Sequence, residues 1–340
     1  MIRHYYQESQ HRFVYLALEL CPASLADIIE NLHDNASERG EWSLRDLVQR
    51  FDAKRAMRDV ANGLGHLHRL GLVHRDIKPQ NILVSSSASS SLGEYRMLIS
   101  DFGMCKKLDV DQSSFLPSGA AAGTAGWRAP EILCGHVKLY ELPATADNSQ
   151  GSMAATIDGT SSETSRLNKS VDIFALGCLY FYILTNGGHP YGDRFEREAN
   201  VIKDKKDFSL LTSTEESTES QDLITRMLQR QPSQRPDTET CLLHPFFWDP
   251  SKRLGFLQDV SDRFEVICKD LKDVDEVLIR LERDAESVVG SDWHEILDQM
   301  LIDDLRQYRT YDGSSVRDLL RALRNKVRLF FTESHFVDLF

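Results

Sequence analysis

The stretch that decides the fold is Val73-His74-Arg75-Asp76-Ile77-Lys78-Pro79-Gln80-Asn81. It places a carboxylate, an ammonium group and a carboxamide on one short loop, which ends in the apolar run Ile82-Leu83-Val84. Two further stretches follow in order, Asp101-Phe102-Gly103 and Ala129-Pro130-Glu131. A lone His-Arg-Asp would be a weak signal, but three such stretches in this order are specific. They predict an active site built on loops.

The three stretches resemble the catalytic loop, the metal-binding turn and the end of the activation segment of protein kinases. The resemblance implies that Asp76 accepts the proton of a substrate hydroxyl and that Lys78 stabilises charge on the transferring phosphoryl group. It also implies that Asn81 and Asp101 hold Mg²⁺ ions beside ATP or ADP. Arg75 resembles the kinase arginine that meets a phosphorylated activation segment.

The composition is that of a soluble globular protein. The 340 residues are 41% hydrophobic and 27% charged, with a net charge of −12, and they suffice for two domains. The negative balance argues against sequence-independent nucleic-acid binding as the main activity, although a local basic stripe stays possible. The cysteines form no C-x-x-C pair, which favours free thiols in a reducing compartment. The N-terminus is no signal peptide, and the longest apolar run, residues 174–184, is too short for a bilayer.

Residues 12–21 predict a buried strand followed by an exit loop. By resemblance this is the last strand of the kinase small lobe and its hinge. Backbone groups near Glu19 and Cys21 would then bond adenine, with Leu18 behind them. On the residues alone, an ordinary core strand is the alternative.

Helical signals follow the hinge. Ser24 is expected to cap a helix that begins at Leu25. Apolar residues at helical spacing from Ser43 to Leu70 predict one long helix that leads into the catalytic loop. His66 and His68 diverge on such a helix, so we do not predict a metal site there.

Two low-complexity stretches, at about 85–94 and 141–168, predict flexible insertions. Between them lies the activation segment, with Ser113 and Ser114 as the expected autophosphorylation sites. A phosphate there would add negative charge facing Arg75. Exposed loop serines without any such role are the alternative.

The large lobe is expected to span residues 22–248. The stretch 170–184 resembles its central buried helix, on which Asp172 would brace the backbone of the catalytic loop. By the same resemblance, Arg235 would pair with Glu131.

Beyond the large lobe the resemblance becomes specific. The stretches that carry it are residues 249–265, Gly290-Ser-Asp-Trp293, Tyr308-Arg-Thr-Tyr311 and 315–326. With the kinase stretches they resemble the inositol-requiring (Ire) family of serine/threonine kinase–endoribonucleases of the unfolded protein response, and ribonuclease L is the related alternative. The likeness runs from about Tyr5 to Lys326. It implies a homodimer that phosphorylates itself and cleaves stem-loop RNA in mRNA splicing, on the cytosolic face of the endoplasmic reticulum membrane.

The last helical stretch has two faces. Its buried stripe is expected to comprise Val316, Leu319, Leu320, Leu323 and Val327. Arg317, Arg321 and Arg324 lie on another face, which could hold RNA phosphates, although a solvated basic face is the alternative. By resemblance, Tyr311 activates the 2′-hydroxyl, and Arg324 and Asn325 stabilise the phosphate in a metal-independent cleavage.

The chain also departs from the family. Leu329 stands where the family has a histidine that acts as the general acid. The absence of this histidine would remove roughly 10²- to 10⁴-fold of acid–base catalysis. The family's Gly-rich loop and its strand lysine and glutamate would precede Met1. We therefore expect a soluble fragment, cut at both ends and impaired in both activities.

The expected fold class is α+β. It comprises a kinase-like fold that lacks most of the small lobe, and an incomplete all-α nuclease domain. The expected segments are a small-lobe remnant at 1–21, the large lobe at 22–248, the nuclease domain at 249–326 and an aberrant tail at 327–340. A non-catalytic nucleotide-binding or dimerisation module is the first alternative. An ordinary cytosolic kinase with an unrelated tail is the second.

Overall fold

The protein is represented by a computed structural model, which describes residues 4–10, 13–32, 44–86, 95–108, 114–115, 123–134, 167–211, 216–270 and 276–332. The chain divides into two compact units, Met1–Phe247 and Trp248–Phe340. In the described residues, no helix combines the length and apolar character that crossing a membrane requires.

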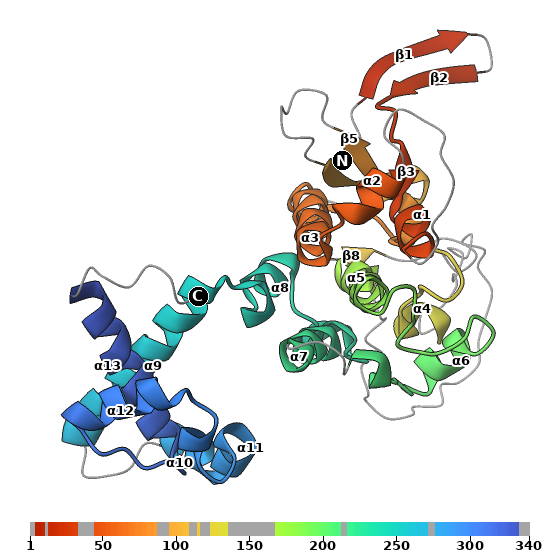
Figure 1. Cartoon of the computed structure of the whole chain (residues 1–340). Coiled ribbons are helices and arrows are strands. Elements are labelled where there is room, and N and C mark those ends of the chain that lie inside the picture. The colour runs from red at the N-terminus through yellow and green to blue at the C-terminus, as the bar shows by residue number, and fades with distance from the viewer. Residues whose placement is uncertain are drawn as a thin grey trace, which may run out of the picture. The chain divides into compact units, whose positions relative to one another are not determined.

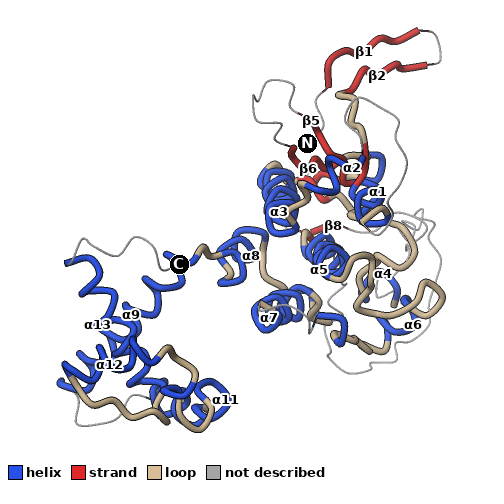
Figure 2. The backbone as a smooth tube through the Cα atoms, viewed as in Figure 1, coloured by secondary structure: helices blue, strands red, loops and turns tan. Residues whose placement is uncertain are grey.

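The strands of the first unit form small antiparallel pairings (Figures 1 and 2). A hairpin joins β1 (His4–Gln10) to β2 (Phe13–Leu18). A three-stranded sheet has the order β3 (Ala23–Ser24), β5 (Ile82–Ser86), β6 (Tyr95–Ile99). Two short pairs are β4 (Leu72–Val73) with β7 (Lys106–Lys107), and β8 (Ser114–Phe115) with β9 (Leu167–Asn168).

The rest of this unit is mainly helical. Its described α-helices are α1 (Leu25–Glu30), α2 (Leu44–Gln49), α3 (Ala53–Arg69), α4 (Pro130–Leu133), α5 (Ser170–Leu184), α6 (Arg197–Ile202), α7 (Ser217–Met227) and α8 (Thr238–Leu243). Helix α5 is buried along Val171–Ile183 and packs against α3 and α7 (Figure 1). A helix that is apolar all round must be covered by other elements on every side. The burial of α5 therefore confirms the expected central buried helix.

The start of α1 confirms the predicted cap. The Ser24 hydroxyl accepts a hydrogen bond from the backbone N–H of Asp27 at 3.2 Å. The Asp27 carboxylate in turn accepts from the backbone N–H of Ser24 at 2.8 Å. This reciprocal capping box satisfies two backbone donors that the helix itself leaves without acceptors.

The prediction of one long helix from Ser43 to Leu70 is wrong, because two helices occupy this stretch. Asp52 has an extended backbone between α2 and α3, and its carboxylate accepts from the backbone N–H of Arg55 at 3.1 Å. This cap favours a new helix start. The apolar pattern continues across the break because Leu47 and Met57 pack in the same core.

The predicted ranges of both insertions are too long, because each includes two residues that belong to a strand. Ser85 and Ser86 belong to β5 and pair with β6, and Leu167 and Asn168 form β9, which pairs with β8. Such pairing uses backbone groups, so a serine-rich or otherwise polar composition does not prevent it. Residues 87–94 and 141–166 lie outside the described part of the chain.

The second unit shows helices and no strand over residues 248–270 and 276–332 (Figure 2). They are α9 (Pro250–Asp270), α10 (Glu276–Arg283), α11 (Ala285–Val289), α12 (Gln299–Tyr308) and α13 (Val316–Thr332). Of the predicted stripe on α13, Val316 and Leu320 are buried in this unit's core and Leu319 packs against it. Helix α13 continues to Thr332, so the first six residues of the expected tail, 327–332, are helical, and they include no Pro or Gly to end a helix.

Candidate active sites

The catalytic loop after β4 is held by one carboxylate from α5. Asp172 is almost completely buried, with 1% of its surface exposed. Its Oδ1 accepts from the backbone N–H of Arg75 at 2.7 Å, and its Oδ2 accepts from that of His74 at 2.8 Å. The ring of His68 lies 2.9 Å from the same Oδ2. These bonds confirm the expected brace, and they stabilise the left-handed backbone of Arg75, which has φ 72°.

Asp76 lies at the centre of a cluster of hydrogen-bond donors. Its Oδ1 accepts from the backbone N–H and the hydroxyl of Thr124, at 2.8 and 2.7 Å. Its Oδ2 accepts from Lys78 Nζ at 2.7 Å and from Asn81 Nδ2 at 3.0 Å. Burial alone would raise the pKa of Asp76, but the bonds from Lys78 and Thr124 and the Lys78 charge outweigh it, so the pKa is lowered. The carboxylate is therefore ionised at neutral pH.

Thr124 is a site residue that the sequence analysis did not single out. Its hydroxyl also accepts from Lys78 Nζ at 2.7 Å, so it contacts both candidate catalytic groups. The preceding Gly123 has φ +95°, and a Cβ there would lie 2.7 Å from the Arg75 carbonyl oxygen. Only glycine permits this approach, which brings Thr124 to Asp76. A Gly-Thr pair shortly before Ala129-Pro130-Glu131 was the available signal.

Asn81 and Asp101 present oxygen ligands that suit Mg²⁺. Asn81 donates through Nδ2 to Asp76, which leaves its Oδ1 available to a cation. Asp101 is exposed and has a left-handed backbone with φ 59°. The two loops are joined because Ser100 donates to the Asn81 carbonyl from its N–H at 2.9 Å and its hydroxyl at 3.0 Å. The residues present therefore fit the ion.

The hinge residues are accessible. Leu18 is 46% exposed, and Glu19 and Cys21 are half-buried. The Glu19 carboxylate accepts from the hydroxyl of Ser85, which ties the hinge to β5. Burial, together with the Glu19 charge, raises the pKa of the Cys21 thiol. The adenine contact assigned to these residues stays a prediction.

The end of the activation segment is anchored in the large lobe, as expected. Arg235 donates from Nη1 and Nη2 to the two carboxylate oxygens of Glu131, at 2.7 and 2.8 Å. Both side chains are buried, so removal of either one would leave the charge of the other without a partner in the interior. Of the expected phosphorylation sites, Ser113 lies outside the described residues, and Ser114 begins β8.

In the second unit, the three predicted nuclease residues come together. Asn325 Nδ2 donates to the hydroxyl of the buried Tyr311 at 3.0 Å. Arg324 donates from Nε and Nη2 to Asn325 Oδ1 at 3.3 and 3.2 Å. Leu329 lies one turn further along α13. The residues adjoin as a catalytic cluster requires, while their roles stay predictions.

Two of the three arginines on the basic face of α13, Arg321 and Arg324, pair with carboxylates, so the alternative of a solvated basic face is wrong for these two, while phosphate binding stays a prediction. Arg324 Nη1 donates to Asp262 Oδ1 on α9 at 3.0 Å. Arg321 pairs with Glu265 on α9 and with Asp318 at 2.9 Å. Both arginine side chains are only 12% exposed. The pattern of α13 alone could not reveal the partners Asp262 and Glu265, because these two carboxylates belong to α9.

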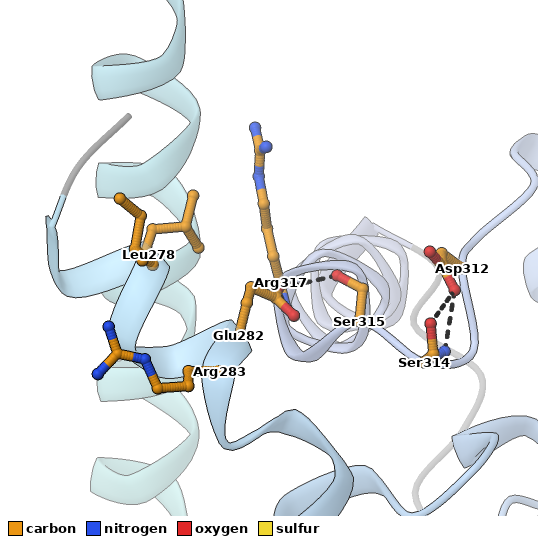
Figure 3. A pocket seen from close by; sticks show the side chains of 8 residues that line it. Leu278, Glu282, Arg283, Asp312, Ser314, Ser315 and Arg317 are labelled. Carbon is orange, nitrogen blue, oxygen red and sulfur yellow. Dashed lines mark hydrogen bonds between the residues drawn. The ribbon is translucent and has the colours of Figure 1, made fainter. Parts of the chain in front are cut away.

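A pocket lies between α10 and the start of α13 (Figure 3). Glu282 on its wall accepts from the hydroxyl of Ser315 at 2.9 Å, and from the backbone N–H groups of Val316 at 3.3 Å and Arg317 at 2.8 Å. It therefore caps α13 from a different helix. Figure 3 shows the guanidinium groups of Arg283 and Arg317 pointing in different directions, so the pocket's cations do not converge on one ligand.

Comparisons with known proteins identify both units. The family described as "Protein kinase domain" matches residues 1–247, and the family "Ribonuclease 2-5A" matches residues 253–338. The serine/threonine-protein kinase/endoribonuclease IRE1 of Hypocrea jecorina is 42% identical over 96% of this chain and 26% of its own length. The Schizosaccharomyces pombe protein named "Sensor for unfolded proteins in the ER ire1" is 41% identical over 96% of this chain and 29% of its own length. The human relative IRE2 is 38% identical, with 96% and 31% covered.

The chain spans between 26% and 38% of the length of these and similar curated relatives. The kinase match covers well over half of the chain, and the ribonuclease match follows it directly. The chain therefore belongs to the protein kinase family, and within it to the Ire-type proteins whose kinase domain is followed by a ribonuclease 2-5A domain.

Proposed function

We propose that the chain transfers the γ-phosphate of ATP to serine or threonine hydroxyls and that its second unit binds and cleaves RNA. The observation that carries the kinase function is the contact of one hydroxyl, that of Thr124, with both Asp76 and Lys78. A hydroxyl in that position resembles a substrate hydroxyl beside its general base and its electrophilic cation.

In this reaction bound Mg²⁺ neutralises the phosphates of ATP. Asn81 and Asp101 would hold the ion, with the Asn81 amide oriented by its bonds to Asp76. The ionised Asp76 carboxylate receives the proton of the attacking hydroxyl, and Lys78 Nζ faces the charge that develops on the phosphoryl group. The Asp172 bonds fix the loop, so these groups need little rearrangement during the reaction.

The substrate of the kinase is proposed to be a second copy of the chain in a homodimer. Ser113 and Ser114 are the proposed acceptors, because they lie in the activation segment. Phosphate there would pair with positive charge near Arg75.

For the second unit we propose metal-independent cleavage of stem-loop RNA in the unfolded protein response, on the cytosolic face of the endoplasmic reticulum. Tyr311 would activate the 2′-hydroxyl, while Arg324 and Asn325 would hold the phosphate. The hydrogen bonds that join these three side chains support the proposal.

One observation favours a second candidate function for this unit. Leu329 offers no proton to a leaving group, so the unit could bind RNA or a second copy without efficient cleavage. In that case the chain acts as a non-catalytic binding or dimerisation module.

The kinase proposal is tested by two measurements on the full chain. Millimolar ADP with Mg²⁺ should raise the melting temperature, and labelled ATP should leave autophosphate that the Asp76→Asn variant lacks. No shift and no label would contradict the proposal. Replacement of Ser113 and Ser114 by alanine should remove most of the label, and undiminished label would rule these sites out.

The nuclease proposal is tested with a short hairpin RNA. The chain should bind the RNA and cleave it slowly, and the Leu329→His variant should cleave faster by at least tenfold, since it supplies the missing acid. Tyr311→Phe should abolish this gain. Binding without cleavage in both forms would favour the non-catalytic module.

A further inference from the structure

Arg324 is enclosed by acceptors from two helices. On α13 itself, Asn325 Oδ1 accepts from Arg324 Nε and Nη2 at 3.3 and 3.2 Å. From α9, Asp262 Oδ1 accepts from Arg324 Nη1 at 3.0 Å. The arginine side chain is 12% exposed and the Asp262 side chain 46% exposed. The guanidinium is therefore held along α9, with the carboxylate at its outer edge.

This arrangement leaves donors for a phosphate. A guanidinium has five N–H groups, of which three are used by Asn325 and Asp262. The remaining two lie one on each terminal nitrogen. Two N–H groups can bind two phosphate oxygens at once, so a phosphodiester need not displace Asp262.

The bonds continue from Arg324 to Tyr311. The Asn325 amide turns its oxygen to Arg324 and its nitrogen to Tyr311, where Nδ2 donates to the hydroxyl oxygen at 3.0 Å. A flip of the amide would turn its N–H groups toward the guanidinium, which has no acceptor, and would break both bonds from Arg324. The phenol oxygen accepts here, so its own proton stays available for another partner. An anchored Arg324 therefore fixes Asn325, which in turn fixes Tyr311.

Resting on the proposed ribonuclease function, we propose that Asp262 is a positioning residue of the RNA site. Its carboxylate orients Arg324 toward a phosphodiester and, through Asn325, orients Tyr311. The opposite role would be that of a competitor, in which the carboxylate occupies the place of the phosphate. The two roles predict changes of opposite sign in RNA affinity.

The binding test uses the full chain and a fluorescein-labelled RNA stem-loop, with fluorescence anisotropy as the readout. Asp262→Ala should weaken binding by about five- to tenfold, since it releases a charge-assisted hydrogen bond that orients Arg324. Asp262→Asn keeps an acceptor oxygen and should stay within about twofold of the wild type. Asp259→Ala, which removes an exposed carboxylate from the same helix, controls for charge alone.

The Arg324→Ala variant serves to test whether Asp262 affects RNA binding through Arg324. There, Asp262→Ala should cause no further loss, because its partner is already absent. Tighter binding by both Asp262→Ala and Asp262→Asn would overturn the proposal and identify Asp262 as a competitor. Equal losses in Asp262→Ala and Asp259→Ala would overturn it as well.

A second measurement needs no RNA. In ¹⁵N-arginine-labelled protein, the Arg324 Nε–H signal, assigned with Arg324→Lys, should be protected from solvent exchange in the wild type and in Asp262→Asn. Asp262→Ala should lose this protection while the other arginine signals persist. An unchanged Arg324 signal in Asp262→Ala would overturn the positioning role. If the wild type binds no RNA, the ribonuclease proposal fails, and this measurement still decides whether Asp262 orients Arg324.

Discussion

The two candidate sites are braced by carboxylates in different surroundings. Asp172 binds the catalytic loop of the kinase unit from the core helix α5, with 1% of its surface exposed. Asp262 binds Arg324 of the nuclease unit from α9, with its side chain 46% exposed. Water replaces lost hydrogen bonds at the second site and cannot do so at the first. The kinase brace should therefore govern folding, and the nuclease brace should govern ligand binding.

The largest expected effect is that of Asp172→Ala. The change leaves the backbone donors of His74 and Arg75 and the ring of His68 without their acceptor in the core. We expect a loss of about 3–5 kcal/mol in the free energy of unfolding, measured with urea, and no autophosphorylation. A loss below about 1 kcal/mol would break the comparison, because it would show that water reaches this brace as well.

The next effect is a pH dependence confined to the kinase unit. Burial, followed by the Arg197 charge, lowers the pKa of His189 to about 3, whereas an unfolded histidine titrates near 6.5. Between these values the unfolded chain binds more protons, so stability falls as the pH falls from about 6.5 toward 3. By pH 4.5 the loss should be about 2–3 kcal/mol.

His189→Asn is the matched variant for this prediction. An amide oxygen can replace the ring Nδ1 that accepts from the backbone N–H of Tyr191, and it does not titrate in this range. Urea unfolding of the kinase unit between pH 4.5 and 7 should therefore give a flatter profile in the variant. If the free energy of unfolding falls equally steeply in the two proteins as the pH falls, His189 is not the cause of the pH dependence.

A smaller effect is expected from Glu282→Ala in the nuclease unit. The variant loses three hydrogen bonds that cap α13, and water can replace part of them at the pocket (Figure 3). Loss of a cap typically costs about 0.5–2 kcal/mol, and we expect a cost in this range for the unfolding of the second unit. Glu286→Ala, an exposed carboxylate on α11, is the control and should change little.

The smallest effect on stability is expected from Asp262→Ala. An exposed ion pair contributes about 0.2–1 kcal/mol, so the melting temperature should hardly move although RNA binding weakens. A destabilisation as large as that of Asp172→Ala would show that the two braces are equivalent and that exposure does not separate them.

The sequence predicted what depends on short, local patterns. The cap at Ser24 and the order of the kinase stretches needed only residue types at fixed spacing, whereas the central buried helix at 170–184 came from the kinase resemblance. The pairing of Glu131 with Arg235 and the brace by Asp172 came from family resemblance, and the structure has both. The break at Asp52 was missed because the apolar period is the same on both sides of it.

By itself the sequence determined the family, the residue types of the catalytic loop and the presence of Tyr311, Arg324 and Asn325. These follow from covalent order, which a one-dimensional pattern preserves. Only the tertiary structure decided that Thr124 contacts Asp76 and that the α9 carboxylates of Asp262 and Glu265 pair with Arg324 and Arg321. Such contacts join segments far apart in the chain, and their energy depends on distance and burial, which no local pattern records.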